Sequence, residues 1–206
     1  MSFPCWGYRL LVSTYKGLWR YLCCHSYYWR LYFPANHTLK VQLMAKKPSQ
    51  SFPNKSYSHC SKLPADIQKL LKKAEAQTKL AYAPYSNFLV GAAILLTNGQ
   101  IIGGCNQENA SYPLCICAER VALYTYGARP IKHKIKALVV TAHNPSKPLT
   151  EVCMPCGACR QVIQEYEARQ NKPIKVYVTS MGLDEIIKID GINAILPSAF
   201  SQSALI

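Results

Sequence analysis

The sequence predicts an α/β fold, with three α/β/α layers built around a mixed β-sheet. Apolar runs rich in branched residues, typical of buried strands, alternate with segments whose apolar residues recur at helical spacing. The pair Asn98-Gly99 between two apolar runs is a strong hairpin signal. Strands that alternate with helices favour a sheet covered by helices, and the hairpin adds an antiparallel pair. About 140 residues of the chain fit this description.

The first part of this domain should contain one helix and the hairpin. Residues 64–66, Pro-Ala-Asp, suit a helix start, because Pro fits a first turn and Asp interacts favourably with the helix dipole. The helix should end near residues 83–84. The run over 88–97 predicts a buried strand, residues 98–99 the turn, and residues 100–103 the returning strand.

Beyond the hairpin, helical and strand-like patterns alternate to the end of the chain. The predicted elements, in chain order, are a polar loop over 106–113, a helix over 117–126, a strand over 136–142, a helix that begins at 156 and runs through 166, and strands over 174–179 and 186–189. The last strand has the weakest signal. A loop with three prolines separates the strand over 136–142 from the helix that follows it.

Composition divides the chain near residues 61–64. Residues 1–62 hold 9 Lys and Arg, no acidic residue and 13 of the 22 aromatic residues, whereas residues 63–206 hold 15 basic and 10 acidic residues. The formal net charge of +14 is therefore mostly a property of the first segment. We expect a basic, aromatic-rich N-terminal extension without a fixed fold over 1–62, a domain over 63–206, and an internal start at Met44.

Other roles for the extension stay open. Basic residues interrupt the stretch over 8–24, which a secretory hydrophobic region would avoid. The acid-free, Arg-containing composition leaves a transit peptide or a membrane-surface role as an alternative, although Tyr and Trp are frequent and Ser and Ala sparse for a transit peptide. A basic, aromatic segment could also bind RNA through phosphate contacts and stacking. No apolar run reaches the roughly 18 residues of a membrane span. We expect a cytoplasmic protein without a membrane partner, and nucleic acid is a disfavoured partner.

Three cysteines in two motifs have the spacing of metal ligands. The motifs Cys117-Ala118-Glu119 and Pro155-Cys156-Gly157-Ala158-Cys159 match the H-x-E…P-C-x-x-C signature of zinc nucleobase deaminases, with Cys in place of His. Two thiolates on one helical turn and a third at another helix start supply three ligands. The fourth tetrahedral position stays open for water, as in a catalytic zinc site. The helix N-termini would stabilise the thiolates, so we expect one Zn²⁺ per subunit.

The residues beside these cysteines suggest further roles. Glu119 lies in the same first turn as Cys117 and can face the pocket without binding the metal, as a proton shuttle requires. Three thiolates leave the site anionic, and Arg120 or Arg160 could offset this charge by donating hydrogen bonds to them. Cys115 or Cys153 could instead complete a closed four-cysteine structural site, which is the main alternative. The other cysteines, at positions 5, 23, 24, 60 and 105, have no such pattern and are expected to be free thiols.

With these motifs in hand, the chain resembles the small homotetrameric cytidine deaminases. The matching stretches, in the family's order, are residues 81–93, 104–112, 117–120, 155–162 and 196–200. The resemblance implies the family's fold and its substrate-binding residues. Phe88 would stack on the pyrimidine, and Asn106 with Glu108 would bind the ribose hydroxyls. Phe200 would close the pocket.

The resemblance also implies shared sites and a reaction. Ala110 and Tyr112 would reach the site of an adjacent subunit, as Phe200 often does in the family, so the homotetramer would be needed for activity. The implied reaction is zinc-dependent hydrolysis of cytidine and 2′-deoxycytidine to uridine and 2′-deoxyuridine, in pyrimidine salvage. Glu119 would carry the proton from water to N3 of the ring and then to the leaving ammonia. A carboxylate at Glu108 would accept a bond from a 3′-hydroxyl and repel a phosphate there.

Two other interpretations remain. One is a deaminase that acts on another nucleoside-like pyrimidine or on cytosine in RNA or single-stranded DNA. The other is a zinc-stabilised binding module without catalysis, which predicts four protein ligands and no exchangeable water.

Overall fold

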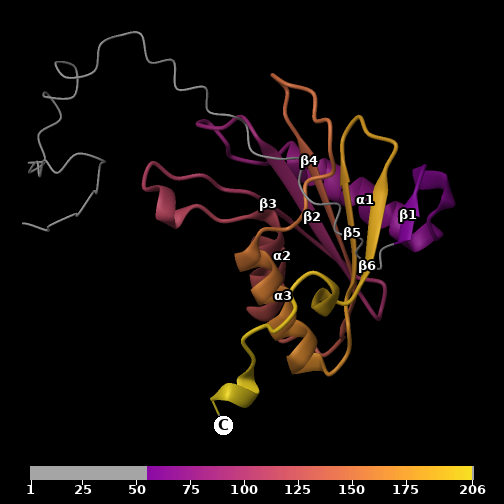
Figure 1. Ribbon diagram of the computed structural model, residues 1–206, viewed down its shortest axis with the longest axis vertical. Helices are drawn as coiled ribbons and strands as arrows, with labels where there is room; N and C mark the ends of the chain where they lie inside the picture. The colour runs from indigo at the N-terminus through magenta and orange to yellow at the C-terminus, as the bar shows by residue number, and fades with distance from the viewer. Residues whose placement is uncertain (1–54, 206) are drawn as a thin grey trace, which may run out of the picture. The chain divides into compact units, whose positions relative to one another are not determined.

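The computed structural model describes residues 55–205, and most of the N-terminal extension predicted above lies outside these residues. Within these described residues, six strands form one sheet in the order β1-β6-β5-β4-β2-β3 (Figure 1). The strands are β1 (Lys55–Tyr57), β2 (Leu89–Leu96), β3 (Ile101–Cys105), β4 (Ile135–His143), β5 (Lys175–Ser180) and β6 (Ile186–Asp190). Strands β4 and β5 are parallel, and every other adjacent pair is antiparallel. The predicted mixed sheet is therefore confirmed.

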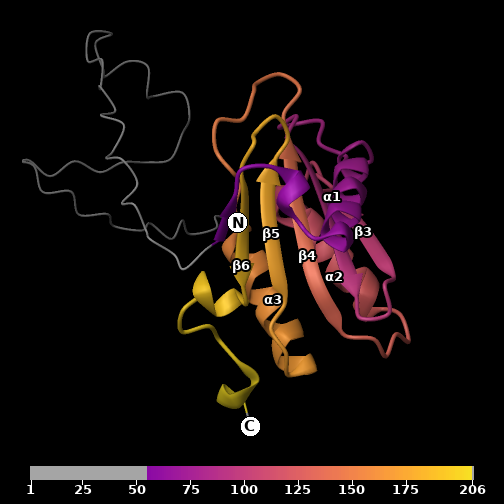
Figure 2. The ribbon, with the colours of Figure 1, turned by 90° about the vertical axis from the view of Figure 1, so that its right-hand side faces the viewer.

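In the part of the chain that the structure describes, three α-helices cover the sheet, one on one face and two on the other. They are α1 (Ala65–Thr78), α2 (Ala118–Gly127) and α3 (Gly157–Gln170). In Figure 1 the strands separate α1 from α2 and α3, and Figure 2 shows the strands side by side, with β6 and β3 toward opposite sides. The predicted three-layer α/β/α architecture is confirmed.

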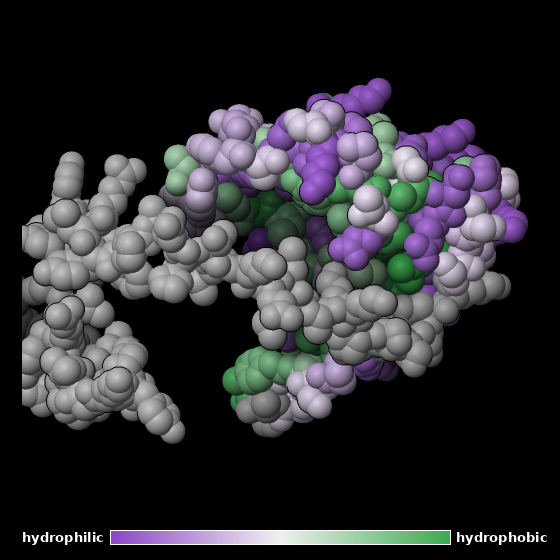
Figure 3. Space-filling view, turned by 45° about the horizontal axis from the view of Figure 1, so that its top comes forward, coloured by the Kyte–Doolittle hydropathy of each residue, from purple (hydrophilic) through white to green (hydrophobic). Residues whose placement is uncertain are grey.

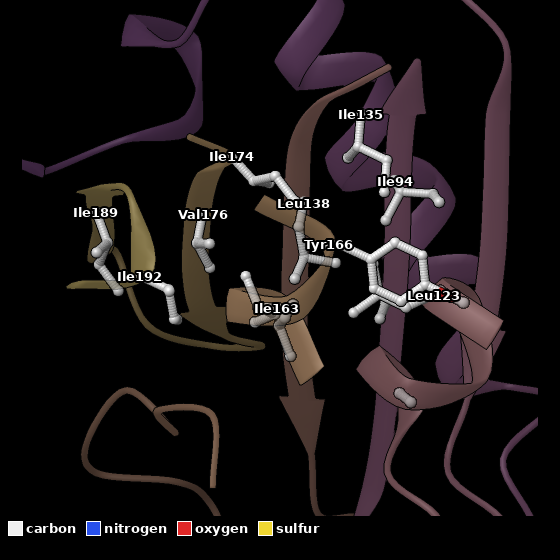
Figure 4. Packing of buried hydrophobic residues seen from close by; sticks show 14 of the residues in the cluster. Ile94, Leu123, Ile135, Leu138, Ile163, Tyr166, Ile174, Val176, Ile189 and Ile192 are labelled. Carbon is white, nitrogen blue, oxygen red and sulfur yellow. The ribbon is translucent and has the colours of Figure 1, made fainter. Parts of the chain in front are cut away.

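Each face of the sheet has its own apolar core. Along β4, Leu138 and Val140 belong to the larger core beneath α2 and α3, whereas Ala137 and Val139 belong to the core beneath α1. Figure 4 shows how side chains of the larger core, such as Leu138 and Ile163, converge between strands and helices. A strand that is buried on both faces needs apolar residues at consecutive positions, which explains the continuous apolar runs in the sequence.

Most predicted elements are found within a few residues of their expected bounds, including the hairpin. Gly99 in the turn between β2 and β3 has a φ of 87°, a conformation that favours glycine. The predicted end of the first helix is wrong, because α1 stops at Thr78 instead of residues 83–84. The chain leaves the helix early to pair elsewhere: Tyr82 N donates to Asn106 O, and Glu108 N donates to Tyr82 O.

The predicted domain boundary also needs a correction. Strand β1 pairs antiparallel with β6, and Ser56 Oγ donates to a Glu185 carboxylate oxygen at 3.3 Å. Residues 55–57 therefore form an edge strand of the sheet, and residues 60–62 form a short helical turn, so neither belongs to an extension that lacks a fixed fold. The strand has only three residues, too few to show a period-2 pattern in the sequence.

No helix of the described residues is long and apolar enough to cross a membrane.

Candidate active site

The sequence of each later helix places a cysteine at its start. Cys117 is the N-cap of α2 and Cys156 is the N-cap of α3, each with extended backbone. Cys159 lies in the first turn of α3 and is fully buried. Because the first backbone N–H groups of a helix have no partner within the helix, both N-termini present partial positive charge to the cysteines.

The three sulfur atoms form a compact cluster. All three Sγ atoms lie within 4.8 Å of one another. The Cys117–Cys156 sulfur distance is 3.9 Å, and the Cys156–Cys159 distance is 3.5 Å. Ligands at about 2.3 Å from a tetrahedral zinc ion lie about 3.8 Å apart, so these distances fit one Zn²⁺ held by three thiolates. Among residues 55–205 this is the one such group of three or more potential ligands.

The two other cysteines of the motifs have different contacts. Cys115 Sγ accepts a hydrogen bond from Asn109 N at 3.3 Å and donates one to Asn109 O at 3.6 Å, which closes the loop before α2. Cys153 N donates to Ser180 Oγ at 3.2 Å. Neither cysteine belongs to the sulfur cluster. The arrangement therefore favours three protein ligands over a closed four-cysteine site.

The cluster stabilises a negative charge on Cys117. Hydrogen bonds from the Cys159 thiol, from Arg120 and from Cys156 lower the pKa of Cys117 to about 5. The same interaction with Cys117 raises the pKa of Cys159, because that thiol is the donor. One thiolate is thus favoured by the protein alone, and a divalent cation would favour all three.

Glu119 lies beside this cluster with its carboxyl group in a nearly dry environment. It occupies the first turn of α2 and is only 4% exposed. Desolvation is the main cause that raises the pKa of Glu119, and the negative charge of Cys117 adds to it. A buried carboxyl group with a raised pKa holds a proton more readily than an exposed one, which suits a group that both takes up and releases protons.

The two predicted arginines differ in what they contact. Arg120 Nη2 approaches Cys117 Sγ at 3.7 Å and Cys115 O at 3.4 Å, as expected for a residue that offsets thiolate charge. Arg160 instead donates to two backbone carbonyls, from Nε to Pro155 O at 2.7 Å and from Nη1 to Ile195 O at 2.8 Å. Arg160 therefore stabilises the turn before Cys156. Its guanidinium donates to backbone carbonyls and not to the thiolates.

Backbone pairing places the segment that contains Asn106 and Glu108 next to the residue that precedes Cys117. Gln107 forms isolated bridges with both Tyr82 and Ile116, so three segments lie side by side immediately before Cys117. This arrangement places the loop before β2 and the loop after β3 next to the start of α2. Figure 3, in which the top of Figure 1 comes forward, shows hydrophobic and hydrophilic residues side by side on this face.

Asn106 and Glu108 are both engaged with the loop before β2. The Asn106 side chain accepts from Val90 N and donates to Phe88 O, each at 2.8 Å. The Glu108 carboxylate accepts from Tyr85 N at 2.9 Å and also from the backbone N and hydroxyl of Ser86. The Ser86 hydroxyl is the main cause that holds the pKa of Glu108 below its usual range. Ser86, which the sequence interpretation did not single out, therefore positions this carboxylate and keeps it ionised.

The remaining candidates lie on the surface of the single chain, except for the half-buried Phe88. Ala110 is exposed, Tyr112 is 67% exposed and Phe200 is 62% exposed. The Tyr112 ring makes an edge contact with Tyr85 at a centroid distance of 5.7 Å. Within residues 55–205, Ala110, Tyr112 and Phe200 make no hydrogen bond or ring contact with the three cysteines.

Comparisons with known proteins identify the family. A family model described as the cytidine and deoxycytidylate deaminase zinc-binding region matches residues 64–172. A cytidine deaminase from Sporosarcina psychrophila is 39% identical over 140 residues, covering 68% of this chain and 95% of the relative. A probable cytidine deaminase from Dictyostelium discoideum is 35% identical over 141 residues, covering 68% of this chain and 88% of the relative.

The solved structures agree with these sequence matches. The crystal structure of cytidine deaminase from Burkholderia pseudomallei superposes with a TM-score of 0.54 at 40% identity, and the match covers 64% of this chain and 97% of that one. Together, the match to the family model, the identity to known relatives and the similarity of fold show that this chain belongs to the cytidine deaminase family.

Proposed function

We propose that this chain hydrolyses cytidine to uridine and ammonia, and that it also accepts 2′-deoxycytidine. The carrying observation is the placement of three sulfur atoms within 4.8 Å of one another next to a buried carboxyl group in the first turn of α2. Three thiolates leave one tetrahedral position for water, and the adjacent carboxyl group can move its protons. A purely structural zinc site would need a fourth protein ligand and would have no use for the carboxyl group.

The chain's own residues divide the chemistry between them. Cys117, Cys156 and Cys159 would hold one Zn²⁺, which supplies, when bound, a Lewis acid that makes water nucleophilic at neutral pH. Glu119 accepts a proton from the attacking water and delivers it to N3 of the pyrimidine. It then transfers the second proton to the leaving amino group, so that one water is consumed and one ammonia is released. Arg120 offsets part of the thiolate charge through Cys117.

The nucleoside would be held by residues from two neighbouring loops. Phe88 stacks on the pyrimidine, and Asn106 with Glu108 binds the ribose hydroxyls. The Asn106 amide retains one free N–H, and the Glu108 carboxylate can accept a further hydrogen bond beyond those from the loop. An ionised Glu108 favours a 3′-hydroxyl over a phosphate, which supports a free nucleoside as the substrate.

The active assembly would be a homotetramer with shared sites. Ala110, Tyr112 and Phe200 are exposed on the single chain, and exposed aromatic rings at a site's edge are typical of residues that contact a partner. A second copy would bury these residues and bring them to its own nucleoside site. The reaction fits a cytoplasmic protein of pyrimidine salvage.

Turnover of cytidine by the purified full chain, followed by ultraviolet absorbance, tests this proposal. We expect turnover of cytidine and 2′-deoxycytidine with one zinc ion per chain, and much weaker turnover of cytidine 3′-monophosphate or a cytosine-containing single-stranded oligonucleotide. Activity on the oligonucleotide alone, or on a modified pyrimidine alone, would replace the proposed substrate. Bound zinc with no deamination of any of these would support a binding module instead.

A further inference from the structure

The start of α3 carries two metal ligands and also binds a later segment of the chain through hydrogen bonds. Arg160 follows the ligand Cys159 directly, and its guanidinium bridges two carbonyls, Pro155 O at 2.7 Å and Ile195 O at 2.8 Å. Gln161 follows next, and its side-chain amide donates to Phe200 O at 2.8 Å. Two consecutive residues of α3 therefore tie the segment over 195–200 to the turn that carries the metal ligands.

The Arg160 guanidinium can hold two carbonyl groups in a fixed arrangement, which a lysine ammonium group could not do. Its planar guanidinium donates from two fixed directions, so that Pro155 and Ile195 are held at a set separation. Pro155 is buried and comes directly before Cys156. A displacement of Ile195 would thus shift the Arg160 side chain and the turn at the start of α3.

The segment beyond Ile195 needs such contacts to keep its conformation. It contains no strand, and its one regular element is the short turn Gln202–Ala204. Ser198 has a φ of 57°, in the left-handed region that non-glycine residues rarely adopt. A residue persists in that region only where its surroundings impose it. The hydrogen bonds from Arg160 and Gln161 lie on either side of Ser198 in the sequence.

Phe200 combines a fixed backbone with an exposed ring. Its carbonyl is bound by Gln161, yet its residue surface is 62% exposed. A ring that served only to anchor the C-terminus would be expected to pack into the core, where its burial would stabilise the fold. A held backbone with an outward ring instead leaves the ring available to a ligand or to a second copy of the chain.

We propose that Arg160 and Gln161 are positioning residues that fix the segment over 195–200, so that the Phe200 ring is presented to a bound nucleoside. The nucleoside lies in the site of the same subunit or of a neighbouring one. This proposal rests on the proposed function, because it assigns the two side chains a role in substrate binding. It also links the metal-ligand turn of α3 to the closure of a pocket.

Replacing the donor at position 161 tests the proposal. In Gln161→Ala we expect the KM for cytidine to rise at least about fivefold, since a base–aromatic stack is weakened, while kcat falls less and zinc content stays the same. Hydrogen exchange of backbone amides over 196–205 should accelerate in the absence of substrate. Gln161→Glu, which keeps the shape and removes the donor, serves if the alanine variant does not fold, with the same expected results.

Gln164→Ala is the matched control, since Gln164 lies one turn further along α3 and no hydrogen bond of its side chain is recorded within residues 55–205. It should change neither the KM nor the exchange rate. The double variant of Gln161→Ala with Phe200→Ala should have the KM of Phe200→Ala alone, because Gln161 acts through that ring.

Three results would overturn the proposal: unchanged exchange over 196–205 in both Gln161 variants, additive KM effects in the double variant, or an equal loss in Gln164→Ala. Arg160→Lys should also accelerate this exchange, because an ammonium group cannot bridge both carbonyls in a fixed geometry. If the wild-type chain does not deaminate cytidine, the proposed function fails and with it the assigned role in nucleoside binding. The exchange result would then still decide whether the two side chains hold the segment.

Discussion

The Glu108 carboxylate accepts hydrogen bonds from Tyr85 N and from the backbone and hydroxyl of Ser86. These donors, the Ser86 hydroxyl first, lower the pKa of Glu108. The folded-state pKa lies below the unfolded value, so this contribution to stability is present above the unfolded pKa and is lost as pH falls through the folded pKa. Glu108 therefore stays ionised at the pH values where the nucleoside would bind.

Replacing this carboxylate should weaken binding of nucleosides that have a 3′-hydroxyl. In Glu108→Gln we expect kcat/KM for cytidine to fall roughly 10- to 100-fold, the usual range for a lost hydrogen bond to a charged group. With 2′,3′-dideoxycytidine, which has no 3′-hydroxyl, wild type and variant should differ much less. Glu165→Gln, on the exposed side of α3, is the control and should leave both substrates unaffected. Equal losses on both nucleosides would show that Glu108 only shapes the loop.

At this scale the sequence predicts chemistry better than contacts. The sulfur cluster was predictable because Cys156 and Cys159 share one turn, and a third cysteine begins another helix. The hydrogen bonds of Arg160 to carbonyls were not, because they depend on where the chain returns near residue 195. Ser86 was missed for the same reason, since its partner lies 22 residues further along.

Helix α1 and strand β2 approach so closely that one position has no room for a side chain. A Cβ at Gly91 would lie 2.0 Å from Ala74 O and 2.8 Å from Thr78 N. These are backbone atoms of α1, which cannot move aside as the end of a flexible side chain would. The absence of a Cβ at this position therefore sets the distance between the helix and the sheet.

Gly91→Ala should be strongly destabilising. We expect the free energy of unfolding to fall by about 3 kcal/mol, at the upper end of overpacking costs, because the contact is with rigid backbone. Chemical denaturation followed by circular dichroism measures it. Gly157→Ala is the control, because a Cβ there meets no atom within 4 Å, and its stability should stay within about 0.5 kcal/mol of wild type. A neutral Gly91→Ala would mean that α1 can shift away from the sheet.

Glu167 joins α3 to two later segments and gives the fold a pH dependence. Its buried carboxylate accepts from Ile174 N at 2.7 Å and from Ile192 N at 3.1 Å. Burial raises the pKa of Glu167 above its ordinary value of 4.5. The Glu167 carboxyl group therefore binds a proton more tightly in the folded state than in the unfolded chain. The stabilisation is fully present below the unfolded pKa and is lost as pH rises through the folded pKa.

The stability of wild type relative to Glu167→Gln should therefore decrease as pH rises above the ordinary glutamate pKa of 4.5, because the glutamine does not ionise. Urea denaturation midpoints of both proteins at increasing pH provide the measurement. A wild-type advantage at position 167 that grows with pH would contradict the assigned effect of burial.

The sequence was least informative about where elements end. An uninterrupted helical pattern continued past Thr78, but Tyr82 pairs with Gln107 and so must leave the helix. That pairing joins residues 25 positions apart, and helical periodicity contains no information about it. Strand β1 was missed because a three-residue edge strand is specified by its partner β6 and not by its own pattern.

For the whole molecule, we expect that the shortest chain with the stability of the full chain must include β1. A chain that starts at Met44 retains β1 and should match the full chain in stability and in cytidine turnover. A chain that starts at Leu63 loses β1 and exposes the edge of β6, which we expect to cost about 1–3 kcal/mol for the few lost backbone hydrogen bonds. Thermal denaturation of the three chains compares them. Equal stability of the shortest chain would show that β1 contributes little.

The central claim is that three cysteines and Glu119 form one hydrolytic site. The most direct measurement is the kcat for cytidine of wild type and Glu119→Gln, each with its zinc content determined. We predict one zinc ion per chain in both proteins and a kcat at least about 10²- to 10⁴-fold lower in the variant, as for loss of a general acid–base. Turnover of the zinc-loaded variant near the wild-type rate would contradict the role of Glu119 and with it the proposed chemistry.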